Sequence, residues 1–305
     1  MKILIMGGTR FVGKALLGKL QEQGHDLTIF TRGVNSLPSN VRHIQGDRNG
    51  DEIEKLNGLK FDVIIDSSGR TKDQTKKVLD ITGPPANRFL YVSSAGIYAD
   101  SETLPLTEDS KVDLESRHIG KAETENWLRL SKVPFTSFRP TYIYGAGNYN
   151  PIEKWFFERI LNDRPIPIPN EGNTITQLGH VNDLAEAMSL SLEKEVSNNR
   201  IYNCSGKKAI TFRGLIYSSA LACGKDPNDI KLFSFDPSKI DKKARKIFPL
   251  RLNHFFTDIS LIENHLNWSP RIELNEGLRE SFQNDYLINK NEKPDFSLDI
   301  NLIGY

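Results

Sequence analysis

The chain has 305 residues, of which 38% are hydrophobic and 26% charged, and its formal net charge at pH 7 is +1. This composition is typical of a globular protein and excludes a fibrous or low-complexity chain. The near-zero net charge excludes a global attraction to polyanions, so any nucleic-acid site has to be a local patch. The length favours one large domain and a smaller one.

Two cysteines, Cys204 and Cys223, are too few for a disulfide framework or a structural zinc site. This usage suits a reducing compartment, so we expect a cytoplasmic protein. No apolar run reaches the roughly 20 residues that a membrane-spanning helix needs. Because the first predicted strand begins at Lys2, we also expect no signal or transit peptide.

The first predicted element is a strand that begins at Lys2 and contains the buried apolar run Ile3–Met6, and a glycine-rich turn and a helix over 11–23 follow it. Gly7 and Gly8 let the backbone turn sharply, and Gly13 lets the helix pack close to the strand. The free N–H groups and the positive dipole end at the start of such a helix favour a pyrophosphate. We therefore predict a dinucleotide-binding turn; the alternative is a glycine-rich turn without a ligand.

A second predicted strand, Leu27–Thr31, runs into Arg32. Proteins that prefer NAD place an acidic residue at this point to hold the ribose hydroxyls, whereas a guanidinium favours the 2′-phosphate of NADP. We therefore predict NADP, rather than NAD, as the preferred cofactor. The alternative is that Arg32 is a solvated side chain at a strand end.

Further strands are predicted over 41–45, 61–66, 88–92 and 135–139. Beyond residue 145 the chain changes character, with an aromatic-rich helix and a proline-spaced segment typical of a sheet edge. We predict an α/β fold, a doubly wound parallel sheet of the Rossmann type with a smaller interleaved C-terminal α+β domain. The predicted boundaries are 1–145 plus about 174–205 for the dinucleotide-binding domain, and about 146–173 plus 206–305 for the small domain and its irregular tail.

Basic side chains cluster over 239–251, where six cations stand against Asp241. Cations interleaved with aromatic rings can follow a phosphate backbone and stack on bases. The alternative is a solvated basic helix, and a second basic stripe over 70–77 has the same two interpretations. The candidate RNA contacts are Lys242, Lys243, Arg245, Lys246, Arg251 and Phe255. The sequence contains no compact cluster of acidic residues that would indicate a metal site.

Several blocks resemble the extended and atypical short-chain dehydrogenase/reductases. The glycine spacing matches, with Arg10 in place of the usual middle glycine, where it either lies along a phosphate or obstructs the groove. Residues 93–98 are similar to the family's S-S-x-x-[VI]-Y segment, and residues 139–145 to its R-P-x-x-[VI]-Y-G segment. The resemblance implies that Ser94 takes the place of the serine that hydrogen-bonds the reacting carbonyl.

The family's Tyr-x-x-x-Lys pair is only half present. Lys121 matches the lysine, on a helix that we expect to include residues 115–123, but Arg117 stands where the tyrosine belongs. Spacing i, i+4 would put both side chains on one face of that helix. A guanidinium, with a pKa above about 12, cannot act as a proton shuttle. We therefore expect impaired hydride chemistry.

The turn and the resemblance together predict a set of dinucleotide contacts, with Asp47 against the adenine. An aspartate after glycine is also ordinary turn chemistry. The predicted contacts are Gly7, Gly8, Thr9, Arg10, Phe11, Val12, Gly13, Thr31, Arg32, Asp47, Arg48, Ser67, Ser68, Gly69, Lys121 and Pro140.

The blocks GGTRFVG, SRHIGKAETE, RPTYIYGAGNYNPIEKWFFERI and TQLGHVNDLA, with the closing PDFSLD, resemble the chloroplast stem-loop-binding proteins and their cyanobacterial relatives. That resemblance implies binding of stem-loop transcripts, association with ribosomal or transcription particles, and RNA cleavage assisted by a divalent cation such as Mg²⁺. Two alternatives stay open. One is an NADP-dependent epimerase, dehydratase or reductase, and the other is a non-catalytic assembly scaffold, including a homo-oligomeric one.

Overall fold

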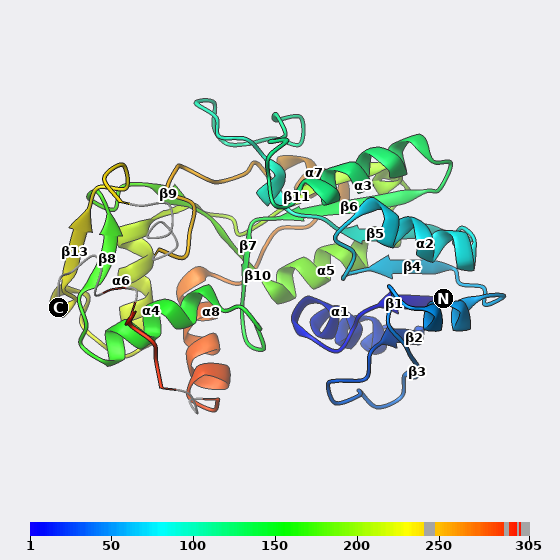
Figure 1. Ribbon diagram of the computed structural model, residues 1–305, viewed down its shortest axis with the longest axis horizontal. Coiled ribbons are helices and arrows are strands. Elements are labelled where there is room, and N and C mark those ends of the chain that lie inside the picture. Colours follow the sequence, from blue (N-terminus) through cyan, green and yellow to red (C-terminus); the bar gives the residue numbers. More distant parts are fainter. Residues whose placement is uncertain (241–247, 290–292, 298, 300–305) are drawn as a thin grey trace. The chain divides into compact units, whose positions relative to one another are not determined.

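A computed structural model describes residues 1–240, 248–289, 293–297 and 299 of the chain (Figure 1). The chain folds into two compact units. Unit 1 comprises Met1–Thr141, Val181–Ser205 and Thr257–Pro270, and unit 2 comprises Tyr142–His180, Gly206–Phe256 and Arg271–Tyr305. Among the described residues, none of the helices combines the length and the apolar content that crossing a membrane requires.

Unit 1, which is described in full, is built on a seven-stranded parallel sheet. The strand order is β11-β6-β5-β4-β1-β2-β3, so the chain winds outward from β1 in both directions. Ligands of open α/β sheets bind at such a reversal, outside the carboxyl ends of the strands. The predicted Rossmann-type sheet is confirmed. The strands are β1 (Lys2–Met6), β2 (Asp26–Thr31), β3 (Arg42–Gln45), β4 (Val63–Asp66), β5 (Arg88–Val92), β6 (Phe135–Pro140) and β11 (Arg200–Cys204).

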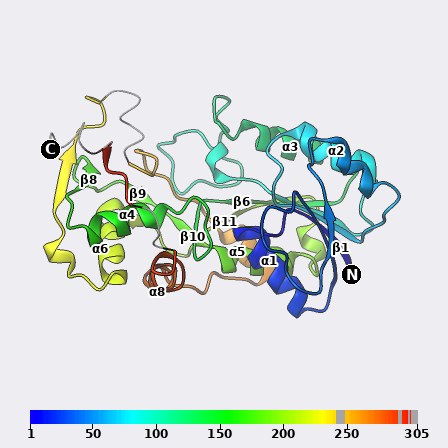
Figure 2. The ribbon, with the colours of Figure 1, turned by 60° about the horizontal axis from the view of Figure 1, so that its bottom comes forward.

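Helices cover both faces of this sheet. Two helices, α1 (Phe11–Glu22) and α5 (Val181–Ser191), pack side by side on one face, while α2 (Lys72–Thr82) and α3 (Ile119–Leu130) cover the other (Figure 1 and Figure 2). Because both faces are covered, the central strand is a continuous apolar run, and the four residues of β1 after Lys2 are at most 1% exposed. The remaining helices of unit 1 are α7 (Ser260–Leu266) and the short 3₁₀ helices η1 (Asp51–Leu56), η2 (Ala95–Ile97) and η3 (Glu195–Ser197).

Unit 2 packs its helices and short strands around an aromatic core. Its described part contains three two-stranded sheets, β7 (Tyr142–Tyr144) with β10 (Leu178–His180), β8 (Ile166–Pro169) with β13 (Leu232–Phe235), and β9 (Ile175–Thr176) with β12 (Ile210–Thr211). The rings of Phe156, Phe157, Phe212 and Phe248 meet in its core. Its helices are α4 (Ile152–Leu161), α6 (Phe212–Ala222), η4 (Pro227–Asp229), α8 (Leu274–Ser281) and a π-helical turn, η6 (Phe282–Tyr286).

The unit boundaries differ from the expected ones. The prediction assigned about 206–305 to the small domain, whereas residues 257–270 belong to unit 1. There α7 packs against β11, and Nδ1 of His265 lies 2.9 Å from the Tyr202 hydroxyl. A late segment therefore completes the outer edge of the first unit.

Part of the C-terminal segment docks on α4, whereas the sequence led us to expect an irregular tail over the surface. Oδ1 of Asp299 lies 2.6 Å from Nη2 of Arg159, and both side chains are at most 4% exposed. The Arg159 guanidinium carbon lies 3.7 Å from the centre of the Trp155 ring and 5.5 Å from that of Phe296. A buried ion pair thus joins the end of the chain to a core helix of unit 2.

Asp299→Asn should lower the free energy of unfolding by about 3 to 5 kcal/mol, because it leaves the buried guanidinium of Arg159 without its counter-charge. Urea unfolding of the full chain measures this loss. The matched control is Asp295→Asn, at an exposed position where an amide oxygen can still accept from the Ser297 N–H, and it should leave the urea midpoint close to that of the unmodified chain. Equal effects of the two variants would contradict a structural role for this ion pair.

Candidate functional site

The turn after β1 has the backbone that a dinucleotide cradle requires. Gly7 and Gly8 have φ values of +111° and +105°, in a region that side chains disfavour. A Cβ on Gly7 would lie 2.7 Å from Oγ of Ser67, and one on Gly13 would lie 2.7 Å from the backbone nitrogen of Gly8. The start of α1 can therefore approach the turn closely, and its N–H groups fit a pyrophosphate.

The residues at the start of α1 carry backbone strain. Phe11, the first residue of the helix, has a φ of +39°, which is an outlier for a bulky side chain. Arg10 precedes it in an extended conformation and is exposed, and its side chain does not cap the helix. Strained residues of this kind gather at ligand-binding turns. The hydroxyl of Thr9 accepts a hydrogen bond of 3.4 Å from Asn35.

The ends of β2 and β3 hold the candidate adenine and ribose contacts. Oγ1 of Thr31 lies 2.9 Å from Nε2 of His43, and it accepts the Gly33 N–H at 3.3 Å. Oδ1 of Asp47 accepts the backbone N–H of Asn49 at 2.8 Å, which is the turn chemistry that the sequence left open for this residue. Arg32 is exposed just beyond β2, where a guanidinium can meet a ligand.

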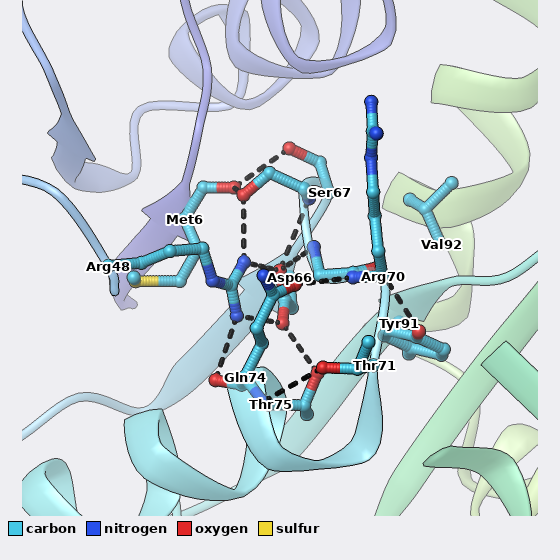
Figure 3. Close-up of polar contacts among 12 residues, drawn as sticks. Met6, Arg48, Asp66, Ser67, Arg70, Thr71, Gln74, Thr75, Tyr91 and Val92 are labelled. Carbon is cyan, nitrogen blue, oxygen red and sulfur yellow. Dashed lines mark hydrogen bonds and ion pairs between the residues drawn. The ribbon is translucent and has the colours of Figure 1, made fainter. Parts of the chain in front are cut away.

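A buried ion pair lies at the point where the strand order reverses (Figure 3). Asp66 ends β4 and is 0% exposed, and its two oxygens accept bonds of 2.7 and 2.8 Å from the two Nη atoms of Arg48. The carboxylate also accepts from the Gly69 N–H and from the Thr75 hydroxyl. Burial alone would raise the pKa of Asp66, but the guanidinium and these hydrogen bonds outweigh burial and lower it.

This pair also engages other residues that the sequence analysis predicts as cofactor contacts. Besides Asp66, Arg48 donates to Oγ of Ser68 at 2.9 Å and to the carbonyl oxygen of Gln74 at 3.0 Å. The Ser67 and Ser68 hydroxyls each donate to the carbonyl oxygen of Met6 at 3.0 Å. These hydrogen bonds tie the end of β1 to the end of β4.

Sequence reasoning missed this network, although one signal was present. An aspartate that ends a fully buried apolar strand needs a counter-charge, because charged side chains are almost never fully buried unless they are paired. Arg70 is the first cation of the basic stripe over 70–77. Figure 3 shows its side chain extending away from the Asp66 carboxylate.

Lys121 lies beyond the carboxyl ends of β4 and β5. Its Nζ donates to the carbonyl oxygens of Val92 at 2.6 Å and Gly69 at 3.3 Å. Burial lowers the pKa of Lys121 to about 8, although the carboxylates of Asp66 and Glu125 act in the opposite direction. Backbone carbonyls at the ends of these two strands thus hold the ammonium group of Lys121.

Arg117 does not share a helix with Lys121, so the expected i, i+4 geometry is wrong. Helix α3 begins at Ile119, and Arg117 lies in the preceding turn, exposed. That turn is fixed by Ser116, whose Oγ accepts the His118 N–H at 3.1 Å and donates to the Gly96 carbonyl at 2.8 Å. Local side-chain bonding of this kind competes with a helical start.

The remaining candidate, Ser94, lies beside the same turn. Its Oγ accepts the Gly96 N–H at 3.0 Å, and Gly96 packs against the ring of His118, since a Cβ there would lie 2.6 Å from Cδ2. Nε of Arg117 donates to Nε2 of His118 at 3.0 Å. The structure therefore brings Ser94 together with a histidine that the sequence analysis did not single out.

Of the six predicted RNA contacts, the structure describes Arg251 and Phe255. Arg251 lies with its guanidinium carbon 4.7 Å from the centre of the Phe255 ring, which is 3% exposed and meets the edge of Tyr142. Phe255 is therefore a packing residue, and the expectation that it stacks on bases is wrong. Four predicted contacts, Lys242, Lys243, Arg245 and Lys246, lie outside the described residues.

Two lysines of the basic stripe are engaged within unit 1. Nζ of Lys76 lies 2.6 Å from Oδ2 of Asp80, and Lys77 donates to the carbonyl oxygen of Gly50 at 3.0 Å. Within the described ranges, no group of three or more His, Cys, Asp or Glu side chains could hold a metal ion.

Comparison with solved structures shows the same fold. The chain superposes on UDP-glucose 4-epimerase of Thermotoga maritima, determined with UDP-glucose, with a TM-score of 0.78 and 20% identity, covering 96% of this chain and all of that one. For UDP-glucuronic acid 4-epimerase of Bacillus cereus in complex with NAD, the TM-score is 0.76 at 18% identity, with the same coverage of both chains.

Sequence comparison gives closer relations. The profile of the NAD dependent epimerase/dehydratase family matches residues 3–205. The chloroplast stem-loop binding protein of 41 kDa b of Arabidopsis thaliana is 42% identical over 302 residues, which span 93% of this chain and 79% of the plant protein. A putative UDP-glucose 4-epimerase of Methanocaldococcus jannaschii is 22% identical over 91% of this chain and 96% of its own length. The chain therefore belongs to the NAD dependent epimerase/dehydratase family, and within it to the family of the chloroplast stem-loop-binding proteins.

Proposed function

We propose that this chain is an RNA-binding protein, built on an epimerase-type scaffold that keeps its dinucleotide turn and has lost hydride transfer. One observation carries the proposal. Arg117 stands at the tyrosine position in a chain that is 42% identical, over 93% of its length, to a relative named as a stem-loop binding protein. Fold likeness to epimerases alone does not assign an activity.

The absence of an acid/base at position 117 is not offset by the buried tyrosine next to Ser94. The Tyr98 hydroxyl donates to Oδ1 of Asn203 at 2.7 Å and accepts from Arg139 at 2.9 Å. Burial raises the pKa of Tyr98 to about 12, although the Arg139 cation opposes the shift. A phenol that is committed to two buried partners and resists ionisation is a poor proton shuttle.

The dinucleotide turn supports binding of a nicotinamide cofactor. Gly7, Gly8 and Gly13 keep side chains out of the cradle, and the exposed Arg32 suits the 2′-phosphate of NADP. When bound, such a cofactor supplies hydride exchange at its nicotinamide ring, and this chain would hold its pyrophosphate at the start of α1. In the proposal the cofactor is a ligand of the RNA-binding protein and not a reactant.

RNA binding has to rest on local charge, because the whole chain carries a formal net charge of only +1. Of the two candidate stretches, the stripe over 70–77 has two of its lysines engaged within unit 1. The cluster over 239–251 begins with Lys239, whose side chain is 81% exposed and lies 3.4 Å from the Asp236 carboxylate. The cluster carries six cations against one acidic residue, whereas the stripe over 70–77 carries four against one. We therefore assign the main RNA contact to the cluster with the larger positive charge.

Replacing Lys242, Lys243, Arg245 and Lys246 together by Ala should weaken binding of a stem-loop RNA and flatten its salt dependence. Each lost phosphate contact removes about 0.7 from the log–log slope, so the slope should fall by up to about three. Fluorescence anisotropy across salt concentrations measures both quantities. The matched control removes four exposed cations of unit 1, Arg42, Arg129, Lys132 and Lys194.

Equal salt slopes for the two quadruple variants would show that the cluster makes no specific phosphate contacts. Absence of RNA binding by the unmodified chain would remove the proposal and favour the assembly-scaffold alternative.

The unmodified chain should bind NADP about tenfold or more tightly than NAD, because a guanidinium that contacts the 2′-phosphate makes a charge-assisted hydrogen bond. Arg32→Asp should remove or reverse this preference in titration calorimetry. Arg129→Asp, at an exposed position on α3, is the control and should leave the ratio unchanged. Equal affinities for both cofactors in the unmodified chain would rule out the assigned role of Arg32.

Neither the unmodified chain nor Arg117→Tyr should catalyse hydride transfer or epimerisation of UDP-sugars. The new tyrosine would lie in the turn before α3, without the helical relation to Lys121 that the reaction uses. Nicotinamide absorbance and chromatography of the sugar products provide the measurement. Turnover by the unmodified chain would instead support a working epimerase.

A further inference from the structure

Three neighbouring loops of unit 1 each carry a single arginine. They follow β4, β1 and β2, which lie side by side and parallel in the sheet, and they comprise residues 67–71, 7–10 and 32–41. Each loop contains one arginine and no other charged residue; in the order of the strands, these are Arg70, Arg10 and Arg32. Because the carboxyl ends of parallel strands meet at one edge of a sheet, the three cations follow this edge as an arginine row.

All three members of the arginine row are exposed, and hydrogen bonds anchor the backbone of two of them. The Arg70 N–H donates to Oε1 of Gln74 at 2.9 Å, and a Cβ on Gly120 would lie 2.5 Å from the Arg70 carbonyl oxygen. The Arg32 carbonyl oxygen accepts from Nε2 of Gln45 at 3.2 Å. These cations are thus presented from fixed positions on the fold.

The buried carboxylate beneath the arginine row does not neutralise it. Asp66, at the end of β4, is 0% exposed, and the two Nη atoms of Arg48 already bind both of its oxygens. The Arg70 side chain extends away from this pair (Figure 3). Burial is the largest cause that lowers the pKa of Lys121, and the Arg70 cation lowers it further. The positive charge of Arg70 therefore reaches Lys121, beyond the ends of β4 and β5.

A dinucleotide has phosphates for only part of the arginine row. NADP carries a pyrophosphate, which fits the glycine turn beside Arg10, and a 2′-phosphate, which suits Arg32. On the β4 side of the turn, the remaining part of the cofactor is nicotinamide riboside, which brings no phosphate to Arg70. The arginine at the end of β4 therefore exceeds what a dinucleotide needs.

The backbone of a polynucleotide has phosphates for the whole row. Neighbouring strands lie about 4.8 Å apart, so the ends of β4 and β2 are separated by roughly 10 Å. A flexible single strand can place several of its phosphates along such a distance, and guanidinium groups bind phosphate in a bidentate manner. At the centre of the row, the glycines leave room for a phosphate to reach the backbone N–H groups at the start of α1.

We propose that the arginine row is a second RNA contact, which binds a single-stranded segment of the RNA and shares the glycine turn with the dinucleotide, so that NADP displaces the RNA from the row. The inference rests on the proposed function, because it requires a chain that binds both ligands. It gives the nicotinamide cofactor a role without hydride transfer, which is to weaken RNA binding. The cluster over 239–251 remains the main RNA contact.

Saturating NADP should weaken binding of a labelled stem-loop RNA by about tenfold or more. It should also flatten the salt dependence by up to about two, since three phosphate contacts at about 0.7 each are lost. Fluorescence anisotropy measures both quantities, and calorimetry establishes the NADP saturation. By linkage, saturating RNA should weaken NADP binding by the same factor.

The possible failures are distinguishable. RNA binding that NADP leaves unchanged, in affinity and in salt slope, would overturn this inference alone, and so would a chain that binds RNA but not NADP. A chain that binds no RNA even without NADP would contradict the proposed function as well.

Arg70→Gln should weaken RNA binding and lower the salt slope by about 0.7, while the Kd for NADP stays unchanged. Arg129→Gln is the matched control, at an exposed position in the last turn of α3, and should change neither ligand. Both side chains are exposed, so folding should be preserved. Equal salt slopes for the two variants, or a loss of NADP affinity in Arg70→Gln, would refute the role assigned to Arg70.

Arg32→Gln should weaken the binding of both ligands, because this arginine is a contact that they share. The measurements are anisotropy of the stem-loop RNA and calorimetry with NADP, as before. A variant that loses affinity for NADP but keeps the RNA affinity and salt slope of the unmodified chain would show that the two ligands use different residues. That result would overturn the shared site.

Discussion

The ion pair between Arg48 and Asp66 holds together the part of unit 1 on which the candidate site is built. A carboxylate that is 0% exposed would be severely destabilising without its guanidinium. Through the hydrogen bonds of Arg48 and the neighbouring serines, this pair joins the ends of β1 and β4 to the start of α2. The glycine-rich turn after β1 therefore rests on a polar network, while Ile3–Met6 of β1 form an apolar run beneath it.

In the proposed function, the cradle for the cofactor and the chemistry of hydride transfer depend on different residues. The glycines of the cradle depend only on close backbone approach, which is independent of whether a hydride is transferred. The proton shuttle, in contrast, depends on one side chain at one helical position, and here α3 begins two residues after Arg117. A scaffold can thus keep the shape of a cofactor site after its reaction has become unavailable, and the freed surface can serve another ligand.

The sequence predicted the strands of unit 1 well, because strands buried on both faces are continuous apolar runs; β5 has the predicted bounds, Arg88–Val92. The predictions failed for side chains whose exposure or pairing depends on residues distant in the sequence. The sequence predicts that Phe255 is an exposed aromatic residue beside a basic cluster, but in the structure Tyr142 and Arg251 pack against its ring. Arg48 and Asp66 are 18 residues apart in the sequence, and no local pattern links them.

Two buried carboxyl groups show how the protein's own partners decide the role of such a group. Asp66 has a bidentate guanidinium and several hydrogen-bond donors, so its pKa falls despite complete burial. Glu153 has no cation beside it, so burial prevails over the hydrogen bonds from Gly145 and Ser281 and raises its pKa to about 7. The first group has no acceptor capacity left for a ligand, and its role is structural. The second is hydrogen-bonded inside unit 2 but lacks a counter-charge, so its protonation state, unlike that of Asp66, changes near neutral pH.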